Sequence, residues 1–297
     1  MSRPLVTVLI PVHNGAEHLT VALASVFEQD FADFEVLVVD DGSTDATPQL
    51  LADCADPRLR VLRLERTGLV GGLNRGLDEA RGDLIARLDA DDEMLPGRLA
   101  RQVEQFRRDP GLVAAGSDYL LFGALTGVVR TPREDRECRA HLVFGSPIAH
   151  PAVMLRADAL RAHGVRYRDE YPHAEDFKLF SELAAVGALA NLVEPGLRYR
   201  IHPAQVSQVE AGPQQRVQLQ ICTENLAGRG VRVSVDRLEP LLWPAGRGWT
   251  AALRYAVLRL PVVLWLGLRT HRTAGLRQAL LVGRERIRTL LSRPAPS

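Results

Sequence analysis

Between residues 6 and 89, short apolar runs rich in β-branched residues alternate with amphipathic stretches. Apolar runs of this length that end in turn residues are typical of buried strands, whereas apolar positions three and four residues apart are typical of helices. The pattern predicts strands at residues 6–11, 35–40, 60–64 and 84–88, and helices at residues 17–29, 48–54 and 72–80. Strands and helices that alternate with short connections favour an α/β fold, in which helices flank a mostly parallel central sheet.

The pattern is less regular beyond Pro96. It predicts a helix at residues 99–108, strands at residues 113–122, 127–130 and 197–202, and a loop at residues 203–212. From Pro213 onward the apolar positions follow a helical spacing. We therefore predict two parts: a domain of residues 1–212 and a helical C-terminal region of residues 213–297.

An apolar stretch at residues 249–268 lies within the predicted helical region. Arg254, Arg259 and Pro261 interrupt it, so no uninterrupted run reaches the roughly 18 residues that a membrane span needs. One interpretation is a helix in a membrane interface, with its apolar side chains buried and Arg254, Arg259 and Arg269 reaching anionic headgroups. The other is a helix that packs on the rest of the protein or on a second copy of it, which would give a homo-oligomer. The sequence leaves both open.

The charges of the chain are nearly balanced, with 37 basic and 36 acidic residues and a formal net charge of +1. Such a chain has no overall field to recruit nucleic acid, so no nucleic-acid partner is predicted. Its three cysteines, Cys54, Cys138 and Cys222, are far apart in no metal-ligand pattern, which favours free thiols in a reducing compartment. No signal-peptide pattern is present at the N-terminus. We expect a cytoplasmic location, peripheral at the inner face of the plasma membrane if residues 249–268 contact lipid.

Closely spaced carboxylates follow the strand predicted at residues 84–88. They belong to Asp89, Asp91 and Asp92. Like charges at one strand end repel each other, which costs stability unless a cation neutralises them, and hard oxygen ligands suit magnesium or manganese bridging to phosphates. The alternative without a ligand is an acidic turn that caps the helix after it.

A second polar cluster, residues 40–45, follows the strand predicted at residues 35–40. Ligands of parallel sheets bind beyond the carboxyl ends of the strands, so this cluster and the acidic one are expected at the same edge. A carboxylate of Asp40 or Asp41 can accept hydrogen bonds from the base or ribose of a nucleotide, and Gly42 allows a sharp turn. A turn rich in Asp, Gly and Ser is also common without any ligand.

Several segments, taken together, resemble the family 2 glycosyltransferases. The resemblance is carried by residues 6–14, 36–45, 72–76, 85–92, 98–102, 150–154, 174–177 and 199–202. They occur in the family's order over about the first two thirds of the chain, and several motifs that agree are more specific than any one of them. The resemblance implies the GT-A fold, the Rossmann-like fold of nucleotide-diphospho-sugar transferases, and it does not extend beyond residue 212.

The resemblance also implies roles for individual residues. The nucleotide-sugar site that it implies comprises Pro11, His13, Glu17, Asp40, Asp41, Arg75, Asp89, Ala90 and Asp91. Within that site, Asp89 and Asp91 resemble the acidic DXD motif, which contacts the ribose and, through a divalent cation, the diphosphate. Asp91 is the expected direct ligand of manganese or magnesium.

Three further residues of these segments complete the implied site. Asp176, beside Glu175, resembles the general base that takes a proton from the acceptor hydroxyl. Without the resemblance, acidic residues at this position simply favour the positive end of a helix. His202 resembles a metal ligand or a diphosphate contact, whereas a lone histidine at a strand end is more often structural.

The resemblance implies an inverting, metal-dependent transfer from a nucleotide-diphosphate sugar, with a UDP-sugar favoured. The acceptor would be a hydroxyl of a glycan or a lipid-linked molecule in cell-surface polysaccharide biosynthesis. The Q-x-x-R-W motif of processive synthases is missing, which favours single additions. Two other classes are considered: a catalytically silent nucleotide-sugar-binding scaffold of the same fold, and a nucleotidyltransferase. Residues 13–17 lack the basic triphosphate-gripping loop that the latter needs.

Overall fold

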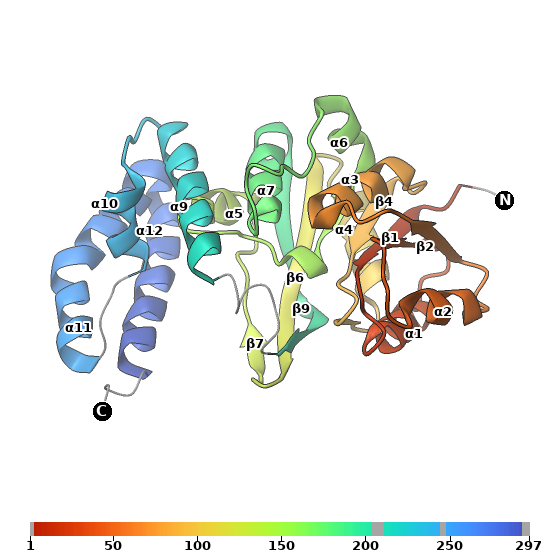
Figure 1. The fold of residues 1–297 in the computed structure, drawn as a ribbon. Coiled ribbons are helices and arrows are strands. Elements are labelled where there is room, and N and C mark those ends of the chain that lie inside the picture. Colours follow the sequence, from red (N-terminus) through yellow and green to blue (C-terminus); the bar gives the residue numbers. More distant parts are fainter. Residues whose placement is uncertain (1–2, 203–210, 244–247, 293–297) are drawn as a thin grey trace.

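The computed structural model describes residues 3–202, 211–243 and 248–292. Figure 1 shows a central sheet with helices packed on it, and a group of C-terminal helices at the end of the molecule opposite the N-terminus. The strands are β1 (Val6–Val12), β2 (Phe34–Asp40), β3 (Leu59–Arg63), β4 (Leu84–Arg87), β5 (Glu93–Met94), β6 (Leu112–Gly123), β7 (Gly127–Val129), β8 (Met154–Arg156) and β9 (Ala188–Ile201).

Helices follow or precede most of these strands. In the first two thirds of the chain they are α1 (Leu19–Phe27), α2 (Thr47–Asp53), α3 (Gly68–Glu79), α4 (Arg98–Arg108), α5 (Asp135–His141), the 3₁₀ turn η1 (His150–Ala152), α6 (Ala157–His163) and α7 (Glu175–Val186). The C-terminal helices are α9 (Ala211–Ala227), α10 (Val235–Leu242), α11 (Gly248–Arg254), the π-helical turn η2 (Tyr255–Arg259) and α12 (Leu260–Ser292).

The sheet has two halves of different character. Its strand order is β3-β2-β1-β4-β8-β6-β9-β5, with β7 paired to β6. The first four strands are all parallel, as the alternating pattern predicts. Beyond β4 the sheet is mixed, because β8 is antiparallel to both β4 and β6, whereas β6 and β9 are parallel. The parallel half therefore meets the mixed half at β4.

Helices cover both faces of the parallel half because alternate residues of its strands point to opposite sides. On one face, Leu9 of β1 belongs to the same buried cluster as Leu73 of α3. On the other face, Val8 and Ile10 belong to a cluster with Leu19 of α1. Seven consecutive residues of β2 are buried, which explains why these strands are continuous apolar runs.

Most of the predicted elements are present, and the differences have local causes. Strand β9 begins at Ala188 and not at residue 197, because it pairs along the length of β6 with a register shift near the turn-like residues 194–196. The short elements α5, α6, β5 and β8 were not predicted, since each is too short to show a periodicity. Most of the loop predicted at residues 203–212 lies outside the described residues.

The C-terminal helices share a buried apolar cluster with the sheet-bearing part, and polar contacts add to this packing. Glu224 of α9 accepts hydrogen bonds from Lys178 of α7 at 2.9 Å and from the hydroxyl of Tyr171 at 3.0 Å. At the other end of the group, Gln278 of α12 lies 3.1 Å from Nδ1 of His141 in α5. These contacts join the predicted helical region to the face of the sheet that α5 and α7 cover.

One helical segment of the described residues, Ala251–His271, is long and apolar enough by length and composition to cross a membrane. Its mean hydropathy is 1.5, and 28% of its most apolar window is buried. Arg254, Arg259 and Pro261 break every uninterrupted apolar run, but they do not lower the average hydropathy of the segment enough to exclude a span. By length and composition the segment is therefore a candidate span, contrary to the expectation from uninterrupted runs.

Candidate functional site

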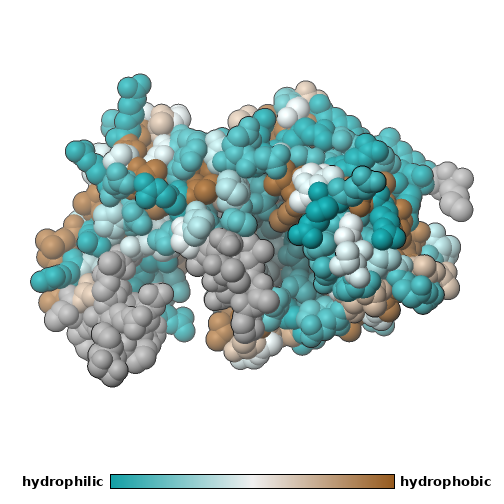
Figure 2. Space-filling model, viewed as in Figure 1, coloured by the Kyte–Doolittle hydropathy of each residue, from teal (hydrophilic) through white to brown (hydrophobic). Residues whose placement is uncertain are grey.

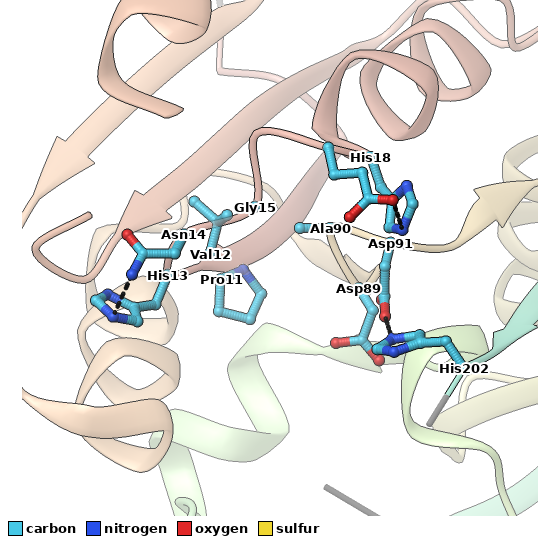
Figure 3. Close-up of a pocket in the computed structure, with 11 residues that line it drawn as sticks. Pro11, Val12, His13, Asn14, Gly15, His18, Asp89, Ala90, Asp91 and His202 are labelled. Atoms are coloured by element: carbon cyan, nitrogen blue, oxygen red, sulfur yellow. Dashed lines mark hydrogen bonds and ion pairs between the residues drawn. The ribbon is translucent and has the colours of Figure 1, made fainter. Parts of the chain in front are cut away.

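A pocket of about 480 Å³ opens at the carboxyl ends of β1 and β4. Figure 3 shows His13 and Asn14 on one side of it, Asp89, Asp91 and His202 on the other, and Pro11 between them. The side chains and backbone that line it belong to Pro11, Val12, His13, Asn14, Gly15, Glu17, His18, Asp89, Ala90, Asp91 and His202. The ends of neighbouring parallel strands thus meet where the sequence analysis expected a ligand.

The loops after β1 and β2 are fastened to each other beside this pocket. Asn14 has a left-handed backbone with φ of 53°. Its side-chain oxygen accepts a hydrogen bond of 2.8 Å from the backbone N–H of Thr44, and its own N–H donates to the hydroxyl of Ser43 at 2.9 Å. The N–H of Gly15 donates to the hydroxyl of Thr47. This network fixes the shape of the first loop, and it gives the cluster at residues 40–45 a structural role.

His13 is oriented by partners on both of its ring nitrogens. Nδ1 lies 2.9 Å from the backbone carbonyl of Asp41, which accepts only a hydrogen bond, so Nδ1 carries the proton and Nε2 of a neutral ring is an acceptor. Nε2 contacts the guanidinium of Arg66. Arg66 was not singled out from the sequence, and this contact places its positive charge at the side of the pocket farthest from the acidic motif.

The side chains of Asp40 and Asp41 are engaged within the protein. Oδ1 of Asp40 accepts a hydrogen bond of 2.9 Å from the N–H of Ser43, which shapes the turn after β2. Asp41 accepts hydrogen bonds from the N–H and hydroxyl of Thr67 and from the N–H of Gly68 at the start of α3. A carboxylate satisfies free N–H groups at a helix N-terminus in this way, and neither side chain lines the pocket.

The acidic motif forms a compact group at the opposite side of the pocket. Ligand oxygens of Asp89, Asp91 and Asp92 lie within 4.8 Å of one another. His202, directly after β9, brings Nε2 to 3.1 Å from Oδ2 of Asp91. The side chain of Arg200 donates to the backbone carbonyl of Asp91 at 2.8 Å, so the end of β9 is held against this motif.

The donor set of this group fits a divalent cation. Asp92 is almost fully buried, and although its Oδ1 accepts a hydrogen bond from the N–H of Arg200, its Oδ2 has no hydrogen-bond partner among the described residues. A buried carboxylate oxygen without a partner is costly. Carboxylate oxygens are ligands that magnesium and manganese prefer, and one imidazole nitrogen can complete such a set. The resemblance implied Asp91 and His202 as ligands, and the structure keeps Asp89 and Asp92, the other carboxylates of the acidic cluster predicted from the sequence, within reach of the same cation.

The electrostatics of the motif agree with this fit. Burial raises the pKa of Asp89, although the nearby charge of Arg87 opposes the rise. Burial, together with the charges of Asp89 and Asp91, raises the pKa of Asp92 well above its ordinary value. These carboxyl groups hold protons more tightly than free carboxylates do, and a bound cation would favour their ionised forms.

A fully buried arginine lies beside the acidic motif. Arg87, in the last position of β4, forms an ion pair with Asp89 at 2.5 Å. Its Nε and Nη1 atoms have no hydrogen-bond partner among the described residues. Burial lowers the pKa of Arg87, but interactions with nearby groups, chiefly Asp89, raise it by more. The pKa of Arg87 is therefore above its ordinary value. No role for Arg87 could be predicted, because an arginine in a short apolar strand gives no signal of its buried partners.

The charge of Arg87 also reaches the carboxylates at the start of α7. Burial and the neighbouring charge of Glu175 raise the pKa of Asp176 to about 7, while Arg87 lowers it. Burial raises the pKa of Glu175 as well, against the effect of Arg87, and the charge of Asp89 adds to the rise. Glu175 and Asp176 therefore lie within electrostatic reach of the acidic motif, although they do not line the pocket.

The turn before α7 is held by a C-terminal helix. His173 has a left-handed backbone with φ of 62°, which is uncommon for a residue with a side chain. Its carbonyl accepts a hydrogen bond of 2.7 Å from the side chain of Gln214 in α9. The position of Glu175 and Asp176 thus depends on a contact with the region beyond residue 212.

The structure brings most of the implied site residues together. Seven of them line the one pocket, namely Pro11, His13, Glu17, Asp89, Ala90, Asp91 and His202. Arg75 lies on α3, half exposed and paired with Glu79, outside the residues that line the pocket. His18 also lines the pocket and was not predicted from the sequence; its ring centroid lies 6.4 Å from that of His202.

Comparisons with known proteins address the family and the fold. A family model described as glycosyl transferase family 2 matches residues 7–143. A protein of Haemophilus influenzae named as an uncharacterized glycosyltransferase is 29% identical over 248 residues, 78% of this chain and 76% of that protein. Succinoglycan biosynthesis protein ExoO of Rhizobium meliloti is 44% identical over 103 residues, which are 34% of this chain and only 30% of that protein.

Two solved structures resemble the fold over nearly the whole chain. Residues 1–349 of TarS from S. aureus, in complex with UDP-GlcNAc, superpose with a TM-score of 0.65 at 15% identity, covering 97% of this chain and 93% of that one. The mannosyltransferase PcManGT from Pyrobaculum calidifontis, in complex with GDP-Man and Mn2+, has a TM-score of 0.58 at 20% identity, covering 96% and 88%. At such identities the likeness shows the fold alone. The family match places residues 7–143 of this chain in glycosyl transferase family 2, and the structural likeness shows that the chain has the GT-A fold.

Proposed function

We propose that the protein transfers a sugar from a nucleotide-diphosphate sugar to an acceptor hydroxyl by a cation-assisted, inverting reaction. The observation that carries the proposal is the pocket itself, which joins a polar loop at one side to an acidic group with a histidine at the other. A nucleotide diphosphate has a base and ribose at one end and a charged diphosphate at the other. The two sides of the pocket are complementary to these two ends.

The donor would lie with its nucleoside against the loop after β1 and its diphosphate near the acidic motif. Pro11, His13 and Glu17 line the first part of the pocket, and the guanidinium of Arg66 lies behind His13. Asp91 and His202 would hold manganese or magnesium, with Asp89 and Asp92 adjacent. The bound cation would stabilise the negative charge that develops on the departing nucleoside diphosphate.

Asp176 is the proposed general base. Its pKa of about 7 suits a group that must be ionised to take a proton from the acceptor hydroxyl, and burial away from water strengthens its affinity for that proton. The buried cation of Arg87, which is paired with Asp89, also acts on this carboxylate and limits the rise of the pKa of Asp176. Single displacement with such a base inverts the configuration at the transferred carbon, and Glu175 would act beside it.

The acceptor and setting are proposed from the relatives. ExoO is named for succinoglycan biosynthesis, and TarS and PcManGT hold UDP-GlcNAc and GDP-Man in their structures. These names support a role in the synthesis of a surface polysaccharide from a sugar nucleotide, with a glycan or lipid-linked acceptor on the cytoplasmic side. We further propose residues 1–212 as the catalytic domain, with the contact between Gln214 and His173 joining the C-terminal helices to it.

The decisive experiment measures nucleotide release and nucleotide binding together. A panel of UDP-, GDP- and dTDP-sugars is incubated with the protein, with and without Mn2+, and NMR reports the anomeric configuration of the product. Asp176→Asn is expected to abolish release and leave nucleotide binding intact. Asp91→Asn is expected to lose both.

Asp158 offers a matched control for Asp176. Both are the second residue of a helix, and each accepts a hydrogen bond of 2.7 Å from the N–H of the next residue, but Asp158 is exposed. Asp158→Asn should release nucleotide normally. Tight Mn2+-dependent nucleotide binding by the wild-type protein without turnover on any donor would favour the silent scaffold. Full activity of the Asp176→Asn variant would show that Asp176 is not the general base.

A further inference from the structure

The segment with membrane-like composition is one arm of a helical hairpin. The chain reverses within the range of α12, because a Cβ on Gly267 would lie 2.3 Å from the carbonyl oxygen of Gly275. Gly283 likewise lies against Leu260, and Tyr255 packs with Ile287. We call residues 251–271 the first arm and residues 275–288 the second arm. Glycines at the crossing let the two backbones approach closely.

The second arm attaches the hairpin to the rest of the protein. Arg277 forms an ion pair with the buried carboxylate of Glu137 in α5, and Gln278 lies 3.1 Å from Nδ1 of His141 in the same helix. At the end of the first arm, Nε2 of His271 accepts a hydrogen bond of 2.9 Å from Arg229. Figure 1 shows α11, where the first arm begins, at the outer end of the molecule.

The outer face of the first arm is an apolar stripe. Leu258 is 68% exposed and Trp265 is 54% exposed. The large apolar residues exposed on this arm are Leu253, Val257, Leu258, Val262, Trp265 and Leu268. Their spacing of three and four residues places them along one side of a helix. Its inner side, which includes Tyr255 and Val263, is buried. Figure 2 shows hydrophobic surface at the edge of the molecule formed by this region.

Only positive charge accompanies the stripe. Residues 240–284 contain no aspartate and no glutamate, although the whole chain has a net charge of only +1. Exposed Arg254 and Arg269 lie near the two ends of the stripe. A helix with an apolar face and flanking arginines has the composition of a segment that binds at a membrane surface. The positive charge of the arginines favours binding to anionic lipid headgroups.

We propose that the apolar stripe docks on the surface of an anionic phospholipid bilayer, with the first arm lying in the interface. The second arm argues against a span, because Arg277, Arg284 and Glu285 would have to enter the hydrocarbon with it and Arg277 would have to leave Glu137. The charge argues against a second copy as the occupant. Two stripes packed face to face would bring arginines together with no carboxylate between them.

Vesicle flotation of the full-length protein tests the proposal. Neutral vesicles of phosphatidylcholine are compared with vesicles that also contain phosphatidylglycerol, at low and high salt. The wild type is expected to float with the anionic vesicles and to be released by high salt. Exchanging both exposed arginines, Arg254→Gln and Arg269→Gln, should weaken binding by roughly tenfold or more. Leu258→Glu with Trp265→Glu should abolish it.

The control variant replaces an apolar residue of similar exposure that lies outside the stripe. Leu125, between β6 and β7, is 58% exposed, and Leu125→Glu should float like the wild type. Circular dichroism establishes that each variant is folded. Equal flotation with neutral and anionic vesicles, or no flotation at all, overturns the proposal. A dimer in sedimentation velocity that Leu258→Glu dissociates, without vesicle binding, would assign the stripe to a second copy.

Discussion

The Nε2 atom of His202 lies 3.1 Å from Oδ2 of Asp91, although 111 residues separate the two in the chain. Asp91 follows β4 and His202 follows β9, so the contact joins the ends of two strands that are not neighbours in the sheet. Hydrogen bonds from Arg200 to Asp91 and Asp92 hold the two ends together. The proposed cation site is therefore complete only when the last strand is in place.

This relationship predicts the effect of removing the imidazole. His202→Ala should weaken Mn2+-dependent nucleotide binding by roughly tenfold or more, because the carboxylates lose their one nitrogen ligand. Isothermal titration of UDP and GDP with and without Mn2+ measures the change. His163→Ala, at the exposed end of α6, is the control and should bind normally. An unchanged Mn2+ dependence in His202→Ala would exclude this residue as a ligand.

A second prediction concerns the pH dependence of turnover. Burial and Glu175 raise the pKa of Asp176 to about 7, so this carboxyl group is protonated below that pH and ionised above it. A base must be ionised, and kcat/KM should therefore rise as the pH increases through about 7. Steady-state rates between pH 5 and 9 measure the profile. Activity that is flat down to pH 5 would contradict the assignment.

The same shift has a consequence for stability. The folded state holds the proton of Asp176 more tightly than the unfolded state does. Burial of this carboxyl group therefore lowers the free energy of unfolding most above pH 7, where the group is ionised in both states. Asp176→Asn removes this cost. It should raise Tm at pH 8 by more than at pH 5, and thermal unfolding at both values measures the difference. Equal changes at the two pH values would show that Asp176 has an ordinary pKa.

Arg87 gives a third prediction, because its charge lowers the pKa of both carboxyl groups at the start of α7. Arg87→Met should shift the rise of kcat/KM to higher pH and lower Tm, since Asp89 loses its buried partner. Arg87→Lys retains the charge and should keep the profile closer to that of the wild type. A profile that stays in place in Arg87→Met would show that Arg87 acts only on the fold.

Asp41 gives a fourth prediction, which separates a cap from a ligand contact. Its carboxylate accepts three hydrogen bonds at the start of α3, so Asp41→Ala should lower the free energy of unfolding by about 1–2 kcal/mol. Asp41→Asn should lose less stability, because the amide oxygen of asparagine can still accept a hydrogen bond. Urea titration measures both. Unchanged stability together with lost nucleotide binding would instead place this side chain against the donor.

Sequence reasoning succeeded where the chain is locally regular. Strands β1, β2 and β4 of the parallel half are almost entirely buried, so they appear as apolar runs, and their carboxyl ends must meet at one edge. This is why the loop at Pro11 and the motif at Asp89 could be expected in one place. The resemblance to the family was needed to add His202 and Asp176 to the predicted site, because their positions relative to the acidic motif depend on the mixed half of the sheet.

The rest could not be predicted because it depends on long-range contacts. Arg87 is an arginine in an apolar strand, and only the fold shows that it lies among Asp89, Glu175 and Asp176. From the sequence, the carboxylate of Asp41 could contact either the N-terminus of a helix or a ligand. In the structure it accepts hydrogen bonds from Thr67, directly before α3.

At β4, one neighbouring strand runs parallel and the other antiparallel. Apart from His202, the residues that line the pocket come from the end of β1 and from the loops directly after β1 and β4, whereas Asp176 lies at the start of α7, beyond β8 in the chain. Under the proposed function, donor binding therefore depends mainly on residues 11–91, whereas the proposed base comes from residue 176, and substitutions around α7 should alter the acceptor side of the reaction more than nucleotide binding.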